Sequence, residues 1–194
     1  MSLMVKSEFW LFERIERFRQ YARDHQKMSK KKFWTLALIV TSIVICAQWA
    51  FAQRYSFGVD PQAQTSIIDS RVFVIDHASA QDLRVGNYYA FTTTDLSPFY
   101  PEGTTFLKEL VAVPGDHILI DSEGAIWVNQ QRIAFWGLPL AEEKFGLPSS
   151  QFQGETTLGE NQYWFLGNYE KSFDSRYWGS VSESQIIGRA YRLF

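Results

Sequence analysis

The chain has 194 residues, a formal net charge of −2 and 46% hydrophobic residues, which is enough apolar sequence for one packed domain and an additional segment. Its single cysteine excludes a disulfide framework or a cluster of thiolate metal ligands within one chain, and its three widely spaced histidines have no ligand spacing. The sequence also has no repeat, no low-complexity segment and no nucleotide-binding loop. We therefore predict no metal ion, no cofactor and no nucleic-acid partner.

Charge is divided unevenly along the chain. Residues 1–32 carry nine Lys and Arg against four Asp and Glu, a net charge of +5, whereas the remainder carries −7. Residues 33–52 contain no charged side chain and would span roughly 30 Å as a helix, the thickness of a bilayer core. Three lysines at 30–32 precede this run and only Arg54 follows it, so the positive-inside rule predicts a cytoplasmic N-terminus and export of the remainder.

Two features of the N-terminal part leave alternatives open. Residues 50–52, Ala-Phe-Ala, have the small-x-small form of a signal-peptide cleavage site. The basic region before the apolar run is much longer than an ordinary signal-peptide start, so an uncleaved anchor at 33–52 is favoured. Residues 8–21 have apolar side chains at helical spacing and predict a helix, which either lies on anionic membrane lipid or forms a solvated or partner-bound cytoplasmic tail.

Residues 53–194 form the predicted exported domain, in which short apolar runs alternate with turn residues. Strand character is found at 71–76, 85–91, 105–113, 117–120, 125–128, 132–133, 163–167 and 186–193. Residues 134–160 are rich in Gly, Pro and Ser and are predicted to be an irregular excursion. No helix of ordinary length is required, so the fold class is all-β, with antiparallel sheets stacked or partly closed into a barrel behind one transmembrane helix.

The strand at 105–113 carries an unexpected lysine. Alternation along it places Lys108 on the same face as Phe106, Leu110 and Ala112. Burial among apolar groups disfavours an ammonium and lowers a lysine's pKa, which is one way for a protein to obtain an amine base at neutral pH. The alternative is that the lysine stem lies on the sheet and its charged head reaches water.

Two segments together resemble type I signal peptidases. Residues 107–116 (LKELVAVPGD) resemble that family's lysine box, an apolar strand that carries the general-base lysine and ends in Pro-Gly-Asp. Residues 165–179 (FLGNYEKSFDSRYWG) resemble its C-terminal box, whose core is Ser-x-Asp-Ser-Arg followed by an aromatic pair and Gly. Residues 86–91 are similar to the family's Gly-Asp-hydrophobic strand. The likeness covers most of residues 59–194.

The resemblance implies a serine nucleophile on a loop shortly after the anchor. Ser56 and Ser66 are the candidates, and Ser70 is a weaker one. We favour Ser66 because it stands just before the first predicted strand, as the nucleophile does in TraF-type peptidases of conjugative transfer systems. Ile68 stands where that subgroup has proline.

The same resemblance implies a Ser-Lys dyad. Neutral Lys108 would take the proton of Ser66, whose hydroxyl attacks the scissile carbonyl to form an acyl-enzyme. Ser172 would orient Lys108 by a hydrogen bond, and Asp174 and Arg176 would form an ion pair that holds the C-terminal box in shape.

An oxyanion also needs preorganised donors. The amide of the nucleophilic serine is expected, and Gln64 and Thr65 are candidates for a second donor. Glu109 stands where many general signal peptidases have arginine, and Asn168 replaces the aspartate of their Gly-Asp-Asn. These differences favour the conjugative subgroup.

The predicted function is a serine endopeptidase of the bacterial inner membrane, with a periplasmic catalytic domain, that matures an exported precursor such as a conjugative pilin. Its partners would be a preprotein or pilin precursor, membrane lipid and, as a candidate, type IV secretion components. One alternative is a general type I signal peptidase. The other is an inactive structural component of a secretion or conjugation apparatus, suggested by Gln64 and Ile68.

Overall fold

The computed structural model describes residues 13–17, 19–20, 29–59, 67, 70–80, 82–94 and 96–193, which fall into two compact units, 1–50 and 51–194. Within the helix predicted for 8–21, the described residues are helical. Helix α2 (Lys30–Arg54, 25 residues) buries none of its side chains and, among the described residues, is the one helix long and apolar enough to cross a membrane. Its length matches the predicted anchor with a few residues added at each end.

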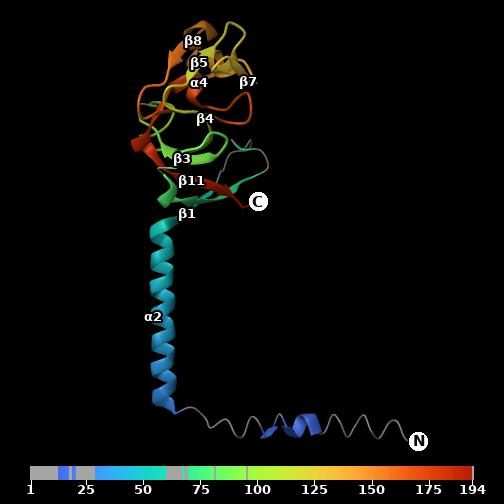
Figure 1. Cartoon of the computed structure of the whole chain (residues 1–194), viewed down its shortest axis with the longest axis vertical. Helices are drawn as coiled ribbons and strands as arrows, with labels where there is room; N and C mark the ends of the chain where they lie inside the picture. The colour runs from blue at the N-terminus through green and yellow to red at the C-terminus, as the bar shows by residue number, and fades with distance from the viewer. Residues whose placement is uncertain are drawn as a thin grey trace, which may run out of the picture. The chain divides into compact units, whose positions relative to one another are not determined.

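The second unit consists of two antiparallel sheets in the described part of the chain. Its strands are β1 (Tyr55–Val59), β2 (Val72–Asp76), β3 (Tyr88–Thr92), β4 (Thr105–Ala112), β5 (His117–Ile120), β6 (Ala125–Val128), β7 (Gln131–Phe135), β8 (Gly154–Thr157), β9 (Gln162–Leu166), β10 (Val181–Ser182) and β11 (Ile186–Arg192). The larger sheet has the order β1-β2-β11-β3-β4-β9-β10 and the smaller one β7-β6-β5-β8. Within this unit, the smaller sheet lies at the opposite end from β1 and β11 (Figure 1). The all-β prediction is confirmed.

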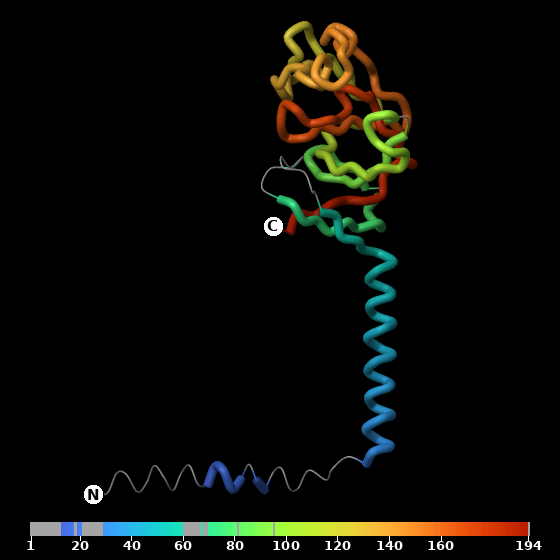
Figure 2. Tube along the Cα trace, turned by 180° about the vertical axis from the view of Figure 1, so that it is seen from behind, coloured from blue at the N-terminus to red at the C-terminus, as the bar shows by residue number. Residues whose placement is uncertain are grey.

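Short helical turns connect the strands. They are η1 (His77–Ser79), α3 (Pro139–Phe145), η2 (Ser149–Phe152), α4 (Ser175–Trp178) and η3 (Glu183–Gln185). The C-terminal strand β11, red in Figure 2, is inserted between β2 and β3, so the last residues of the chain complete the middle of the larger sheet.

The sequence missed three strands and two short helices, α3 and α4. β1, β8 and β10 are short, and most of their residues are exposed or half-buried, so they have little apolar periodicity and form by pairing with β2, β5 and β9. The prediction that 134–160 is irregular is wrong in part, because the segment contains α3, η2 and β8. Proline at the start of α3 and left-handed Gly146 after its end (φ 64°) are typical helix boundaries.

Strand β4 lies between β3 and β9 and separates two apolar clusters. Its even-numbered residues, from Phe106 to Ala112, are buried, while the odd-numbered ones are exposed or half-buried. Phe106 and Leu110 belong to the larger core, which includes the aromatic side chains of β3 and β9. Leu107 packs instead against a smaller cluster that includes Ile67, Phe73 and Ile75. The alternation predicted for this strand is confirmed.

Candidate active site

Lys108 is buried in the middle of the larger sheet. It pairs with Tyr89 of β3 in the strand register, and only 2% of its surface is exposed. Its Nζ atom donates a hydrogen bond to Ser172 Oγ at 2.9 Å, and Ser172 is fully buried. The amine at the end of the side chain therefore does not reach water, which excludes the alternative of a lysine that extends out of the sheet. A buried amine favours its neutral form because desolvation penalises the ammonium.

Gly167 makes this contact possible. A Cβ atom built at this position would overlap Ser172 Oγ and would lie 3.4 Å from Lys108 Nζ. The residue follows β9, so a side chain here would fill the space in which lysine and serine meet. Sequence reasoning gave Gly167 no role beyond its place in the motif. A glycine is needed at this position because β4 and the C-terminal box approach each other closely in space.

Asp174 and Arg176 form a buried, two-pronged ion pair. Arg176 Nε lies 2.8 Å from Asp174 Oδ1 and Nη2 lies 2.9 Å from Oδ2, and both side chains are fully buried. The carboxylate also accepts from the amide of Gly167 at 3.1 Å, and Arg176 Nη2 donates to the carbonyl of Ser172 at 2.9 Å. Burial opposes the guanidinium charge, but Asp174 outweighs it, so the pKa of Arg176 lies above its usual value.

A cavity of about 100 Å³ adjoins Lys108. Two further lysines line it, and their environments differ. Lys171 Nζ lies 2.8 Å from Glu143 Oε1, so its charge is compensated. Lys144 Nζ lies instead 4.3 Å and 4.1 Å from the ring centroids of Tyr100 and Phe173. The Lys144 charge therefore disfavours a second positive charge on Lys108 across the same cavity.

The predicted nucleophile and oxyanion donors, Ser66, Gln64 and Thr65, lie outside the described residues, as does Ile68. The residue after Ser66 is described: Ile67 is 1% exposed and belongs to the small cluster against which Leu107 packs.

The other serines that the sequence offered are described. Ser56 lies on β1, and its Oγ is 2.9 Å from His77 Nε2. Ser70 is buried, with 3% of its surface exposed.

The face of β4 opposite Lys108 carries Glu109. Partial burial raises the pKa of this carboxyl, although Arg192 and a hydrogen bond with Tyr88 act in the other direction. The Tyr88 hydroxyl in turn accepts from Asn168 Nδ2 at 3.1 Å. The two positions that depart from the general signal peptidase pattern, Glu109 and Asn168, thus converge on one tyrosine. No sequence periodicity relates these residues.

No metal site is seen in the part of the chain that the structure describes, where no three His, Cys, Asp or Glu side chains are grouped closely enough to hold an ion. The Lys108 site offers an amine, a hydroxyl and a buried ion pair. This set suits proton transfer and nucleophilic attack.

Comparison with known proteins assigns the family. The family model for signal peptidase, peptidase S26, matches residues 30–194. The chain belongs to this family. A probable signal peptidase I-2 of Synechocystis sp. is 30% identical over 115 residues, which cover 59% of this chain and 49% of that protein. A signal peptidase I of Pseudomonas fluorescens is 21% identical over 173 residues, covering 73% of this chain and 56% of that protein.

The chain spans about half the length of these signal peptidase relatives. Among solved structures, it is similar to a signal peptidase I from Enterococcus faecalis V583, with 22% identity and a TM-score of 0.35 over 55% of this chain and 95% of that one.

Proposed function

We propose that this member of the signal peptidase family is a membrane-anchored serine endopeptidase in which Ser66 is the nucleophile and Lys108 the general base. The observation that carries the proposal is the buried Lys108 amine, held at 2.9 Å by Ser172 beside Lys144, whose own amine lies over the Tyr100 and Phe173 rings. A neutral amine at physiological pH is the group that such chemistry needs. The single apolar helix α2 suits the anchor.

In the proposed mechanism, Lys108 Nζ accepts the proton of the Ser66 hydroxyl as Oγ attacks the scissile carbonyl. The resulting ammonium donates that proton to the leaving amine when the peptide C–N bond breaks and the acyl-enzyme forms. Lys108 then takes a proton from water as the water oxygen attacks the ester carbonyl, and it returns that proton to Ser66 Oγ when the bond between Oγ and the acyl carbon breaks. Ser172 positions Nζ throughout, and the Ser66 amide with Gln64 or Thr65 would stabilise the oxyanion.

Sheet order favours Ser66 over Ser56 as the nucleophile. Three strands, β2, β11 and β3, separate the Ser56 strand from β4. At about 4.8 Å per strand, this places β1 roughly 19 Å from β4 along the sheet. Ile67, covalently bound to Ser66, shares its cluster with Leu107, the neighbour of Lys108. Ser66 is thus bonded to a residue that packs beside the Lys108 strand, whereas Ser56 lies four strand spacings away, and this difference supports Ser66.

For the substrate, we propose an exported preprotein. The relatives of known name are signal peptidases I, which supports a general preprotein peptidase. A specialised precursor such as a conjugative pilin, with type IV secretion components as partners, remains a finer prediction supported by Glu109 and Asn168. An inner-membrane location with a cytoplasmic N-terminus rests on the lysines at 30–32 and the positive-inside rule.

The test is cleavage of co-expressed precursors, read by the masses of precursor and product. One precursor should carry an ordinary Ala-x-Ala signal and the other should be a pilin precursor. Ser66→Ala and Lys108→Ala should abolish product, while Ser56→Ala should cleave as the unchanged protein does. Cleavage of both precursors would identify a general peptidase, and cleavage of the pilin alone a specialised one. Absence of product from both would favour the inactive structural component.

A further inference from the structure

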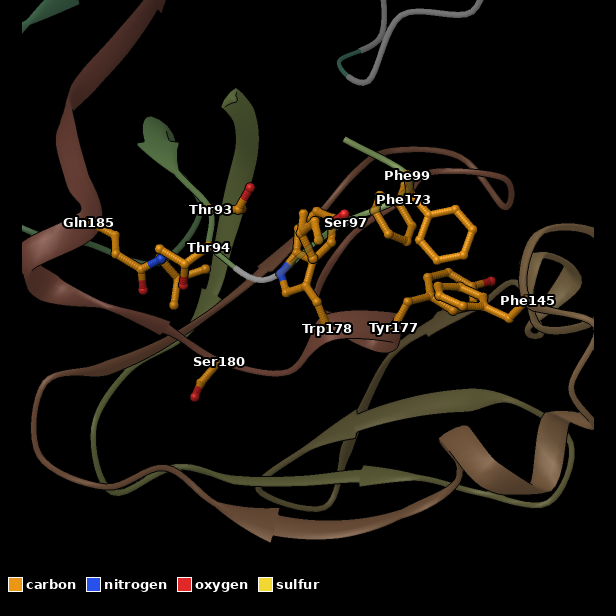
Figure 3. A pocket seen from close by; sticks show the side chains of 12 residues that line it. Thr93, Thr94, Ser97, Phe99, Phe145, Phe173, Tyr177, Trp178, Ser180 and Gln185 are labelled. Atoms are coloured by element: carbon orange, nitrogen blue, oxygen red, sulfur yellow. The ribbon is translucent and has the colours of Figure 1, made fainter. Parts of the chain in front are cut away.

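A second and larger cavity lies beside the C-terminal box. Its volume is about 320 Å³, which lies at the lower end of the range for ligand sites in proteins. Phe99, Phe145, Phe173 and Tyr177 gather at one side, Thr93 and Gln185 lie at the other, and Trp178 stands between them (Figure 3). The cavity is therefore half aromatic and half polar.

Two polar atoms of this cavity are buried without a hydrogen-bond partner among the described residues: Thr93 Oγ1 and Trp178 Nε1. Thr93 is only 4% exposed. The neighbouring Gln185 is different, because its Nε2 donates to the carbonyl of Thr92 at 3.0 Å and its Oε1 accepts from the amide of Ser182 at 2.8 Å. Leaving a buried polar atom unpaired costs about 1–3 kcal/mol, so two such atoms in one cavity point to a partner supplied from outside.

The lining defines the chemistry of that partner. The described residues that line the cavity include no Lys, Arg, Asp or Glu. An indole N–H can only donate, and a threonine hydroxyl can also donate, so both atoms match an acceptor oxygen. The aromatic side requires an apolar body. A peptide carbonyl next to an aliphatic or aromatic side chain has both properties and carries no charge.

One side chain lines both this cavity and the smaller cavity at Lys108. Phe173 lines both cavities and directly follows Ser172, the partner of Lys108 Nζ. Its ring packs 4.8 Å from that of Trp178. The Phe173 ring therefore borders the Lys108 cavity on one side and packs against Trp178, which carries one of the unpaired donors, on the other.

We propose that this cavity is a substrate subsite, remote from the scissile bond, for an uncharged apolar residue whose backbone carbonyl accepts hydrogen bonds from Trp178 Nε1 and Thr93 Oγ1. The inference rests on the proposed function, since it assumes that the substrate is a polypeptide. It adds a specificity determinant for long substrates.

The test uses two capped peptides from one preprotein cleavage junction, a long one and a truncated one, with the full chain in detergent. Thr93→Val replaces the hydroxyl with a methyl group of similar size, and Thr157→Val, an exposed site on β8, is the matched control. Losing a neutral hydrogen bond should lower kcat/KM for the long peptide about 3- to 10-fold and leave the short peptide unaffected. Equal effects of Thr93→Val on both peptides, or none on either, would overturn the subsite.

Binding is also measured without catalysis. The indole N–H signal of Trp178, assigned by its loss in Trp178→Phe, should shift when the long peptide is added to the Lys108→Ala protein, and should not shift with the short peptide. An unmoved signal at saturating peptide would contradict the subsite. If the unchanged protein cleaves neither peptide but the indole signal shifts, the proposed function fails and the binding site stands.

Discussion

Gly167→Ala is expected to disrupt the site from a position that carries no functional group. The added Cβ would overlap Ser172 Oγ and would lie 2.5 Å from Ser172 Cβ. The backbone has little room to retreat, because the Gly167 amide donates to the buried Asp174 carboxylate at 3.1 Å. Overpacking of this kind costs about 1–3 kcal/mol. We therefore expect a free energy of unfolding lower by about that amount, and a loss of cleavage because Ser172 moves away from Lys108.

Denaturant unfolding and precursor cleavage measure the two effects. Gly58→Ala is the control, because its Cβ would meet Ile75 Cδ1 at 3.3 Å, the end of a flexible side chain on the neighbouring strand. The double variant Gly167→Ala with Ser172→Gly removes both overlapping atoms, so stability should largely return while cleavage should not. A Gly167→Ala protein as stable and active as the unchanged one would refute the packing argument.

Three further predictions concern charge. Lys144→Met should move the pH midpoint of the acid limb of the cleavage rate upward by about one pH unit, and Lys144→Arg should leave it in place, since a nearby cation disfavours protonated Lys108. An unmoved midpoint in the pH–rate profile would exclude this role. Asp174→Asn leaves a buried guanidinium uncompensated and should lower the free energy of unfolding by about 3–5 kcal/mol, as measured by denaturant. A hydrogen bond from Arg54 holds the pKa of Asp76 below its usual 3.8. The ionised Asp76 carboxylate therefore stabilises the folded protein above pH 3.8, and this stabilisation is lost as the pH falls through the lower pKa of the folded state. Asp76→Asn should therefore destabilise the protein at pH 7 but not in strong acid, and equal losses at both pH values would contradict the assignment.

The sequence predicted best what depends on local periodicity. The alternation around Lys108 is a property of one strand, so the sequence placed the lysine among apolar neighbours. Whether its amine is buried or reaches water was decided only by the structure. Helix α2 could be predicted equally well from its apolar run, because a membrane helix forms all of its backbone hydrogen bonds within itself. Strands β1 and β8 were missed because their pairing, rather than their composition, makes them strands.

Contacts across the fold were beyond the reach of sequence periodicity. Gly167 and Lys144 act on Lys108 through space, from segments 59 and 36 positions away along the chain. Nothing in their local sequence distinguishes them from a turn glycine or an exposed helical lysine. The unpaired indole of Trp178 was hidden for the same reason, since it becomes unusual only when the surrounding cavity forms.

The C-terminal box acts on Lys108 indirectly, through a series of contacts. Asp174 fixes both the Gly167 amide and the Arg176 guanidinium, and Arg176 in turn holds the carbonyl of Ser172 at 2.9 Å. Because the backbone of Ser172 is fixed in this way, its hydroxyl is held at hydrogen-bond distance from Lys108 Nζ. In the proposed reaction the ion pair therefore needs no contact with substrate, and its loss should affect cleavage through the position of Ser172.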